Sequence, residues 1–256
     1  MAKKTNRPAN ARQAKIEAAR KNTGSGANKI IVAAVVVVVA IVAVVGGVVI
    51  ASQQKQDRVG TSTAVPAAAG AMGEGFVANK DVTLVAGAPT LDVYEDFQCP
   101  ACAEFERGAG STITDLAEQG KIKLVYHLKT IIDSNTGTTH SLTMGNAALC
   151  AADAGRFQPF HDAVYANMPA QEGAGWTKAQ TEGFAQKAGL SGEALDTWQS
   201  CVDDKKYTAY VESTEDASTK AGITGTPTIQ LAGKTLDLNQ VGDAAGLVAA
   251  IEAATK

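Results

Sequence analysis

The sequence predicts an α/β domain in which strands at both ends enclose a long helical segment. A Cys-x-x-Cys motif, Cys99 to Cys102, directly follows a short apolar run at residues 91–94. The pattern from about 132 to 222 is almost wholly helical, and β-type residues return after it. A separate apolar stretch, residues 30–51, lies well before this domain and predicts one N-terminal transmembrane helix.

The charge of the chain is concentrated at its N-terminus. Residues 1–29 hold eight Lys or Arg and one acid, Glu17, within a 256-residue chain of net charge −3. The next 22 residues, 30–51, carry no charged or polar side chain, which is long enough to cross a bilayer and apolar on every side. Basic residues on this flank predict a cytoplasmic tail at 1–29 and a domain outside the cell, and not a nucleic-acid-binding arm.

A cleavable signal peptide is the alternative to this anchor. Residues 49–51 before Ser52 could form a cleavage site, but the apolar region of a signal peptide is usually about 7–15 residues long. We therefore favour an uncleaved anchor. Residues 52–80 are rich in Gly, Ala, Thr and Ser, and we expect a flexible linker that holds the domain roughly 30 Å from the membrane.

The first half of the domain predicts a β-α-β unit. We expect strands at 82–85 and 91–94, separated by a turn at 87–89. A helix begins at the Cys-x-x-Cys motif, loosens around Gly108 and Gly110, resumes at Ser111 and ends at Gly120. A β-type run at 122–128 completes the unit.

The second half predicts several helices and then a β-β-α unit. Plausible helix ends are Gly155, Gly189 and Gly222, with starts near Ser141, Thr177 and Ser191. Residues 228–231 and 234–238 read as a hairpin, and residues 244–254 as a closing amphipathic helix. This order is that of a thioredoxin fold, here residues 81–256, with an inserted α-helical domain at about 132–222.

The Cys-x-x-Cys motif predicts disulfide chemistry. At the start of a helix both sulfurs lie on one side of the first turn, close enough to bond to each other. The free N–H groups and the helix dipole favour a thiolate at Cys99, the form that attacks and leaves in disulfide exchange. Pro100 suits this position because its missing N–H would be unpaired there, and Ala101 completes the active-site dipeptide.

Two motifs together resemble the DsbA-like thiol-disulfide oxidoreductases. They are Tyr-Glu-Asp-Phe-Gln-Cys-Pro-Ala-Cys at 94–102 and Gly-Thr-Pro-Thr at 225–228, and the resemblance spans roughly residues 80 to 256. It implies catalytic roles for Cys99 and Cys102, a cis Pro227 beside them, and a substrate groove lined by the backbone of Thr226. Such a groove recognises the main chain of an extended segment, and so accepts many sequences.

The resemblance also implies partners. We expect reduced exported proteins as substrates and a quinone-linked membrane reoxidase of the DsbB or vitamin K epoxide reductase type. No cofactor or metal site is expected, and no segment before Val82 predicts a dimer, so a monomer is expected. The alternatives are a membrane-tethered reductase or isomerase, and a non-catalytic chaperone or binding module whose Cys pair is an inert disulfide.

The sequence departs from this family at one buried position. Many members have a glutamate six residues before the first cysteine, where this chain has Val93. Glu95 or Asp96 could substitute, and strand alternation puts Glu95 on the face of Val93, but the favoured interpretation of Glu95 is a solvated carboxylate. The Pro-Ala dipeptide lacks the histidine of the most oxidising relatives, which leaves the redox potential open.

Cys150 and Cys201 form a second pair, for which a structural disulfide between two helices is the favoured interpretation. Two buried thiols and a redox relay from Cys102 are the alternatives. A zinc or iron–sulfur site with four thiolates is disfavoured, because Cys150 and Cys201 lie 51 positions apart.

The remaining histidines and aromatic residues predict packing roles. His127, His140 and His161 are expected to pack or to form helix-surface hydrogen bonds, although His140 could approach the active face. The aromatic side chains of the helical segment are expected to form its core; they are Phe157, Phe160, Tyr165, Trp176, Phe184 and Trp198.

Overall fold

The computed structural model describes residues 33, 36–38, 40–47 and 60–255, which belong to two compact units, Met1–Lys55 and Gln56–Lys256. In the first unit the described residues are helical, and their Val and Ile side chains are more than half exposed. Among all the described residues, no helix has the length and apolar character needed to cross a membrane. The predicted tail lies outside the described residues, and the predicted span at 30–51 lies partly outside them.

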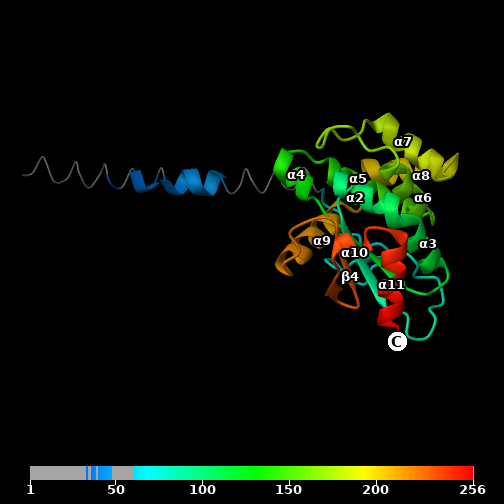
Figure 1. Cartoon of the computed structure of the whole chain (residues 1–256). Coiled ribbons are helices and arrows are strands. Elements are labelled where there is room, and N and C mark those ends of the chain that lie inside the picture. The colour runs from blue at the N-terminus through cyan, green and yellow to red at the C-terminus, as the bar shows by residue number, and fades with distance from the viewer. Residues whose placement is uncertain (1–32, 34–35, 39, 48–59, 256) are drawn as a thin grey trace, which may run out of the picture. The chain divides into compact units, whose positions relative to one another are not determined.

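The second unit is built around a five-stranded sheet (Figure 1). The strand order is β1-β3-β2-β4-β5, so β2 lies at the centre, parallel to β3 and antiparallel to β4. In this register Leu91 lies beside Leu124, and Val93 lies between Tyr126 and Ile229. The strands are β1 (Phe76–Val77), β2 (Thr90–Glu95), β3 (Lys123–Leu128), β4 (Thr228–Leu231) and β5 (Lys234–Thr235).

One helical run connects β2 to β3 and completes the β-α-β unit. It consists of α2 (Pro100–Phe105), the π-helix η1 (Glu106–Gly110) and α3 (Ser111–Glu118). The loosening predicted around Gly108 and Gly110 is therefore a π-helix. A Cβ at Gly108 would overlap the carbonyl oxygen of Gly242, so glycine there lets η1 approach the loop before the last helix closely.

Six helices fill the segment between β3 and β4, as the sequence predicts. They are α4 (Ile131–Thr136), α5 (His140–Ala152), α6 (Phe157–Tyr165), α7 (Lys178–Lys187), α8 (Glu193–Asp203) and α9 (Thr208–Lys220). Thr177 caps α7 through a capping box with Gln180. A disulfide joins Cys150 on α5 to Cys201 on α8, with the two Cα atoms 5.9 Å apart.

The aromatic side chains of this segment divide between two places. Phe160, Phe184 and Trp198 are buried among the helices, and the Trp198 Nε1–H donates a hydrogen bond of 2.9 Å to the carbonyl of Ala147. Trp176 is only partly buried. Phe157 instead packs on the sheet, where its ring centroid lies 5.3 Å from that of Tyr126 on β3. Tyr165 packs on the turn after β2, with its ring centroid 5.3 Å from that of Phe97.

The prediction of a flexible linker at 52–80 is wrong for the second half of that range. Phe76–Val77 forms β1, which pairs antiparallel with β3, and Phe76 is buried. The buried Asn79 side chain donates to the carbonyls of Ala117 and Ile122, and accepts from the Leu124 N–H. One apolar and one amide side chain therefore attach this stretch to the domain; residues 52–59 lie outside the described residues.

Two strand predictions also need correction. Residues 82–85 form no strand: β1 pairs with β3 at that end of the sheet, Leu84 and Val85 are exposed, and the Val85 N–H donates to the carbonyl of Gly120. The second hairpin strand is shorter than expected, because Leu238–Val241 forms helix α10, capped by the Asp237 carboxylate. The last helix, α11 (Ala244–Ala254), has the predicted bounds.

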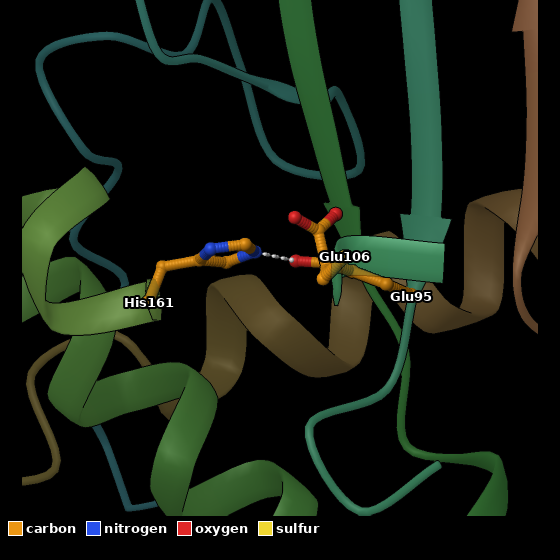
Figure 2. A group of neighbouring side chains, drawn as sticks. All are labelled: Glu95, Glu106 and His161. Carbon is orange, nitrogen blue, oxygen red and sulfur yellow. Dashed lines mark hydrogen bonds and ion pairs between the residues drawn. The ribbon is translucent and has the colours of Figure 1, made fainter. Parts of the chain in front are cut away.

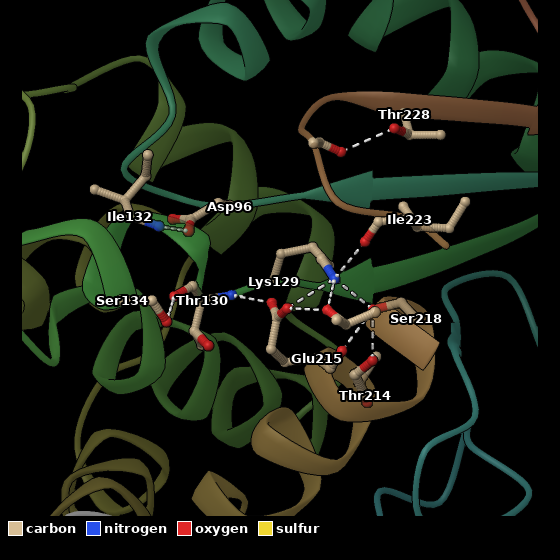
Figure 3. A network of polar contacts seen from close by, with 12 residues as sticks. Asp96, Lys129, Thr130, Ile132, Ser134, Thr214, Glu215, Ser218, Ile223 and Thr228 are labelled. Atoms are coloured by element: carbon tan, nitrogen blue, oxygen red, sulfur yellow. Dashed lines mark hydrogen bonds and ion pairs between the residues drawn. The ribbon is translucent and has the colours of Figure 1, made fainter. Parts of the chain in front are cut away.

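A buried lysine ties β3 to α9 (Figure 3). The Lys129 side chain is fully buried, and its Nζ donates to Glu215 Oε1 at 2.9 Å, Ser218 Oγ at 2.6 Å and the carbonyl of Ile223 at 3.1 Å. The Thr130 N–H donates to the other Glu215 oxygen at 2.8 Å. Burial opposes the ionised form of Glu215, but these hydrogen bonds prevail and lower its pKa. Lys129 therefore positions α9 and the segment that leads to β4.

We expect Lys129→Met to lower the free energy of unfolding by about 3 kcal/mol, because it leaves a mostly buried carboxylate without its cation. Chemical denaturation followed by tryptophan fluorescence would measure this. Lys178→Met is the matched control, since the bridge from Lys178 to Asp203 is exposed on both sides and its loss should cost less than about 1 kcal/mol. Equal effects of the two substitutions would contradict the assigned role of Lys129.

The Cys150–Cys201 disulfide should stabilise the fold by restricting the unfolded chain. For a loop of this length we expect Cys150→Ala/Cys201→Ala to lower the free energy of unfolding by about 2–4 kcal/mol. Cys99→Ala/Cys102→Ala, compared with the dithiol form of the wild type below pH 6, where Cys99 is protonated, is the control because it removes no cross-link. An unchanged denaturation midpoint in the first variant would contradict this expectation.

Candidate active site

A buried carboxylate shapes the turn that leads into the Cys-x-x-Cys motif. Asp96, directly after β2, accepts hydrogen bonds from the Gln98 N–H at 2.9 Å, the Ser141 hydroxyl at 2.6 Å and the Ile132 N–H at 3.0 Å. Burial raises the pKa of Asp96 to about 7, although these hydrogen bonds oppose the shift. The turn is thereby fixed to α4 and α5 of the helical segment.

Gln98 strengthens the same connection. Its side-chain Nε2 donates to Asp133 Oδ1 at 2.9 Å and to Ser141 Oγ at 2.8 Å. The N–H groups of Ser141 and Leu142 at the start of α5 donate to the Asp133 carboxylate. The residue before Cys99 is therefore held by the helical segment, which fixes the start of α2.

Cys99 is the N-cap residue of α2, and Pro100 occupies the first turn. The structure brings this cysteine to the loop before β4: its Sγ–H donates to the carbonyl oxygen of Thr226 at 3.4 Å, and the Thr226–Pro227 peptide bond is cis. Cys99 and Cys102 are both free thiols. Cys99 retains 6% exposure, whereas Cys102 has none.

The two thiols have opposite electrostatic environments. A hydrogen bond from the Cys102 thiol is the main reason that the pKa of Cys99 is lowered to about 6. Partial burial opposes this shift. Hydrogen bonds from the Thr226 side chain and from the N–H groups of Cys102 and Ala101 lower the pKa further. Burial raises the pKa of Cys102 well above its usual value, and Cys99 and Glu95 raise it further. The pair therefore holds its negative charge on Cys99.

The structure contradicts the expectation that Glu95 is solvated. Its side chain is 1% exposed, and its Oε1 lies 2.8 Å from His161 Nε2. His161 on α6 is fully buried, so its expected role in packing or at a helix surface is replaced by a buried pairing with a carboxylate. Glu95 is thus a buried carboxyl group on the Cys102 side of the site.

A third ionisable group, Glu106 on η1, lies beside this pair (Figure 2). Burial raises the pKa of Glu106 to about 8, and His161 opposes that rise. Sequence reasoning missed Glu106 and the pairing of His161. The sequence held a signal for the burial of Glu95 alone: strand alternation in β2 put Glu95 on the same face as Val93, which faces the core.

The other two histidines lie elsewhere. His127 Nε2 is 3.0 Å from Asp92 Oδ1, and its ring stacks on Tyr94 with centroids 4.1 Å apart. His140 is the first residue of α5, and its ring lies against Gly175. Each is held within the fold by these neighbours.

A thioredoxin-type sheet with a Cys-x-x-Cys dithiol at the start of a helix, facing a cis-proline loop, defines an oxidoreductase of the thiol-disulfide class. A sequence model described as thioredoxin matches residues 85–253. The chain belongs to the thioredoxin family.

Solved structures with this fold carry related chemistry. The chain is 29% identical to oxidised DsbA from Mycobacterium tuberculosis, with a TM-score of 0.56, and the match covers 69% of this chain and 89% of that one. It is also 29% identical to the reduced disulfide bond oxidoreductase DsbG of the same organism, with a TM-score of 0.56, and that match covers 68% of this chain and 83% of that one. It is 25% identical to MdbA, a thiol-disulfide oxidoreductase from Actinomyces oris, with a TM-score of 0.58, and that match covers 67% of this chain and 82% of that one. No curated protein matches the chain significantly.

The difference between the two thiols predicts a pH dependence that can be measured. In the reduced protein we expect thiolate absorbance to appear with a midpoint near pH 6, because the pKa of Cys99 is lowered to that value. Alkylation of Cys99 should follow the same curve. The pKa of Cys99 is lower in the folded state than in the unfolded state. The free energy of unfolding of the reduced protein, relative to that of Cys99→Ala, should therefore increase between pH 6 and the pKa of an unfolded cysteine, and then stay constant.

Cys102→Ala tests the assigned cause. It removes the hydrogen bond that contributes most, so the midpoint should move upward toward that of an ordinary cysteine, about pH 8.5. A wild-type midpoint already near that value would contradict the described electrostatics of the pair.

Proposed function

We propose that this protein is a membrane-tethered thiol oxidase that introduces disulfide bonds into exported proteins through Cys99 and Cys102. A substrate thiolate attacks the Cys99 sulfur of the enzyme disulfide, and Cys102 leaves and takes up a proton. A second substrate thiolate then attacks the substrate sulfur of the mixed disulfide, and Cys99 leaves as a thiolate. The substrate loses two electrons and the enzyme gains them as a dithiol.

The geometry that carries this proposal is the position of Cys99 at the N-cap of α2, where the Cys102 thiol and backbone N–H groups favour its thiolate. A thiol with a pKa of about 6 is a better leaving group than an ordinary cysteine, and its stabilisation favours the reduced enzyme over the disulfide. Favouring the reduced enzyme means that the oxidised enzyme gives its disulfide away. Burial keeps Cys102 protonated. In a mixed disulfide, Cys102 can lose its proton and attack the Cys99 sulfur, which expels the substrate thiolate and re-forms the Cys99–Cys102 disulfide.

The Thr226 backbone supports a role in binding substrate. Its carbonyl already accepts from the Cys99 thiol, so a chain bound along it would present its own cysteine next to Cys99. Backbone pairing at this position would recognise an extended segment with little dependence on side chains. A broad range of unfolded substrates follows from this mode of binding.

The N-terminal sequence supports a location outside the cytoplasm. A basic tail at 1–29 followed by 22 apolar residues is typical of an anchor whose N-terminus stays in the cytoplasm. A domain on the outer side would meet newly exported chains. An electron acceptor in the membrane, a quinone-linked oxidoreductase of the DsbB or vitamin K epoxide reductase type, would then restore the Cys99–Cys102 disulfide.

The test uses the full chain in lipid nanodiscs, oxidised and then mixed with a reduced two-cysteine peptide. We expect the wild type to transfer one disulfide per chain and Cys99→Ser to transfer none. In a separate mixture, reduced Cys102→Ser is added to an activated, disulfide-bonded form of the peptide, and a mixed disulfide should be trapped on Cys99. Cys150→Ala/Cys201→Ala is the matched cysteine control and should retain transfer. The equilibrium potential against glutathione should lie above about −220 mV.

Two results would overturn the oxidase proposal. A potential near that of thioredoxin, about −270 mV, would instead indicate a reductase fed from the membrane. Full complementation of an export-folding defect in cells by Cys99→Ser/Cys102→Ser would indicate a chaperone that does not use the dithiol.

A further inference from the structure

Glu95, Glu106 and His161 form a compact group of ligand atoms, called here the Glu-Glu-His cluster. One carboxylate oxygen from each Glu and one nitrogen of His161 all lie within 4.8 Å of one another. The three residues come from β2, η1 and α6, and Figure 2 shows both carboxylates at the Nε2 edge of the imidazole ring. Three separate elements thus meet at one point.

The hydrogen bonds within the cluster leave it incomplete. Glu95 is 1% exposed, yet its Oε2 has no hydrogen-bond partner, and neither has the buried Oε1 of Glu106. Two carboxyl groups face one imidazole, and the hydrogen bond of its Nε2 is with Glu95. Buried carboxylate oxygens without partners are costly, and a bound cation would satisfy both of them.

The surroundings of His161 are those of a metal ligand. Its Nδ1 lies 3.1 Å from Asp162 Oδ1, which leaves Nε2 directed at the cluster, and a carboxylate on the second ring nitrogen is the usual arrangement for a metal-binding histidine. The rings of Phe97, Tyr126 and Tyr165 lie around the imidazole with centroids 4.8–5.7 Å away. This apolar shell fixes the ring and keeps the local dielectric low.

The cluster also has a route to solvent. A surface pocket is lined by both Glu106 and Asp162, with Gly110 and Tyr165 beside them. Gly110 contributes directly, because a side chain there would overlap the Glu106 carboxylate. The pocket therefore gives an ion access to Glu106, whereas Glu95 and His161 are buried.

We propose that the Glu-Glu-His cluster binds one divalent first-row transition metal ion, of which Zn²⁺ is the best match, through Glu95, Glu106 and His161. One imidazole nitrogen and two carboxylate oxygens suit such an ion, whereas Mg²⁺ and Ca²⁺ prefer oxygen ligands alone. The ion would take the place of the hydrogen bond between Glu95 and His161. It would join β2, η1 and α6 behind the active site, and the cysteine pair supplies no ligand.

Binding can be measured without interference from the thiols. The experiment uses the full, tag-free chain with Cys99→Ala/Cys102→Ala, freed of metal and titrated with Co²⁺, whose visible absorption reports its ligands. We expect one Co²⁺ per chain, displaced by Zn²⁺, and a higher melting temperature with Zn²⁺. His161→Gln and Glu106→Gln should abolish both signals, and Asp162→Asn should weaken binding about 10- to 100-fold.

His127→Gln is the matched control, because it breaks a second histidine–carboxylate pair on the same sheet and should leave binding unchanged. Asp162 is more than half exposed, so Asp162→Asn still tests the site if either ligand variant fails to fold. Absence of Co²⁺ binding at millimolar metal, unchanged binding in Asp162→Asn, or equal loss in His127→Gln would overturn the proposal. Because this chain lacks both active-site thiols, the outcome is independent of the proposed oxidase activity.

Discussion

The site depends on the burial of one carboxylate, that of Asp96. This side chain has no exposure, and three donors from the β2–α2 turn, α4 and α5 surround it. A buried carboxylate must keep its hydrogen bonds, so the turn cannot move without both helices. The helical segment between β3 and β4 thereby fixes the turn that places Cys99 at the start of α2. This helical segment is a direct part of the active-site framework.

Charge is distributed unequally across the dithiol. Cys99 lies next to the carbonyl of the cis-proline loop, and the Cys102 thiol together with N–H groups at the start of α2 stabilises its thiolate. Cys102 lies toward the interior, where burial and the nearby Glu95 disfavour its ionisation. The same strand supplies both environments, because β2 ends in Glu95 and continues into the turn that leads to Cys99. A buried acid, Glu95, thus lies two residues after Val93 in β2.

Sequence reasoning predicted the elements whose signals are local. The β-α-β unit, the helical segment, β4 and the last helix follow from periodicity and from glycine or proline punctuation. The role of residues 76–79 was not predicted, because one Phe and one Asn in a Gly- and Ala-rich stretch give no periodic pattern. Residues 82–85 misled for the opposite reason: their composition is β-type, but β1 takes the position beside β3.

The candidate site was predictable only where its residues are close in sequence. The Cys-x-x-Cys motif and the Gly-Thr-Pro-Thr segment are recognisable in isolation. The pairing of Glu95 with His161 joins residues 66 positions apart, and no local pattern reports such a pairing. The environment of Glu106 depends on a π-helix, which shifts the helical register and which propensity does not reveal.

That π-helix lies between two buried faces of one helical run. In α2 the buried residues include Cys102, and in α3 they are Ile113 and Ala117. A π-helical turn is equivalent to one extra residue in an α-helix, so it changes the register between them. The same turn carries Glu106 to Glu95 and His161. One short segment therefore links the cysteine pair both to the packing of α3 and to a buried acidic group.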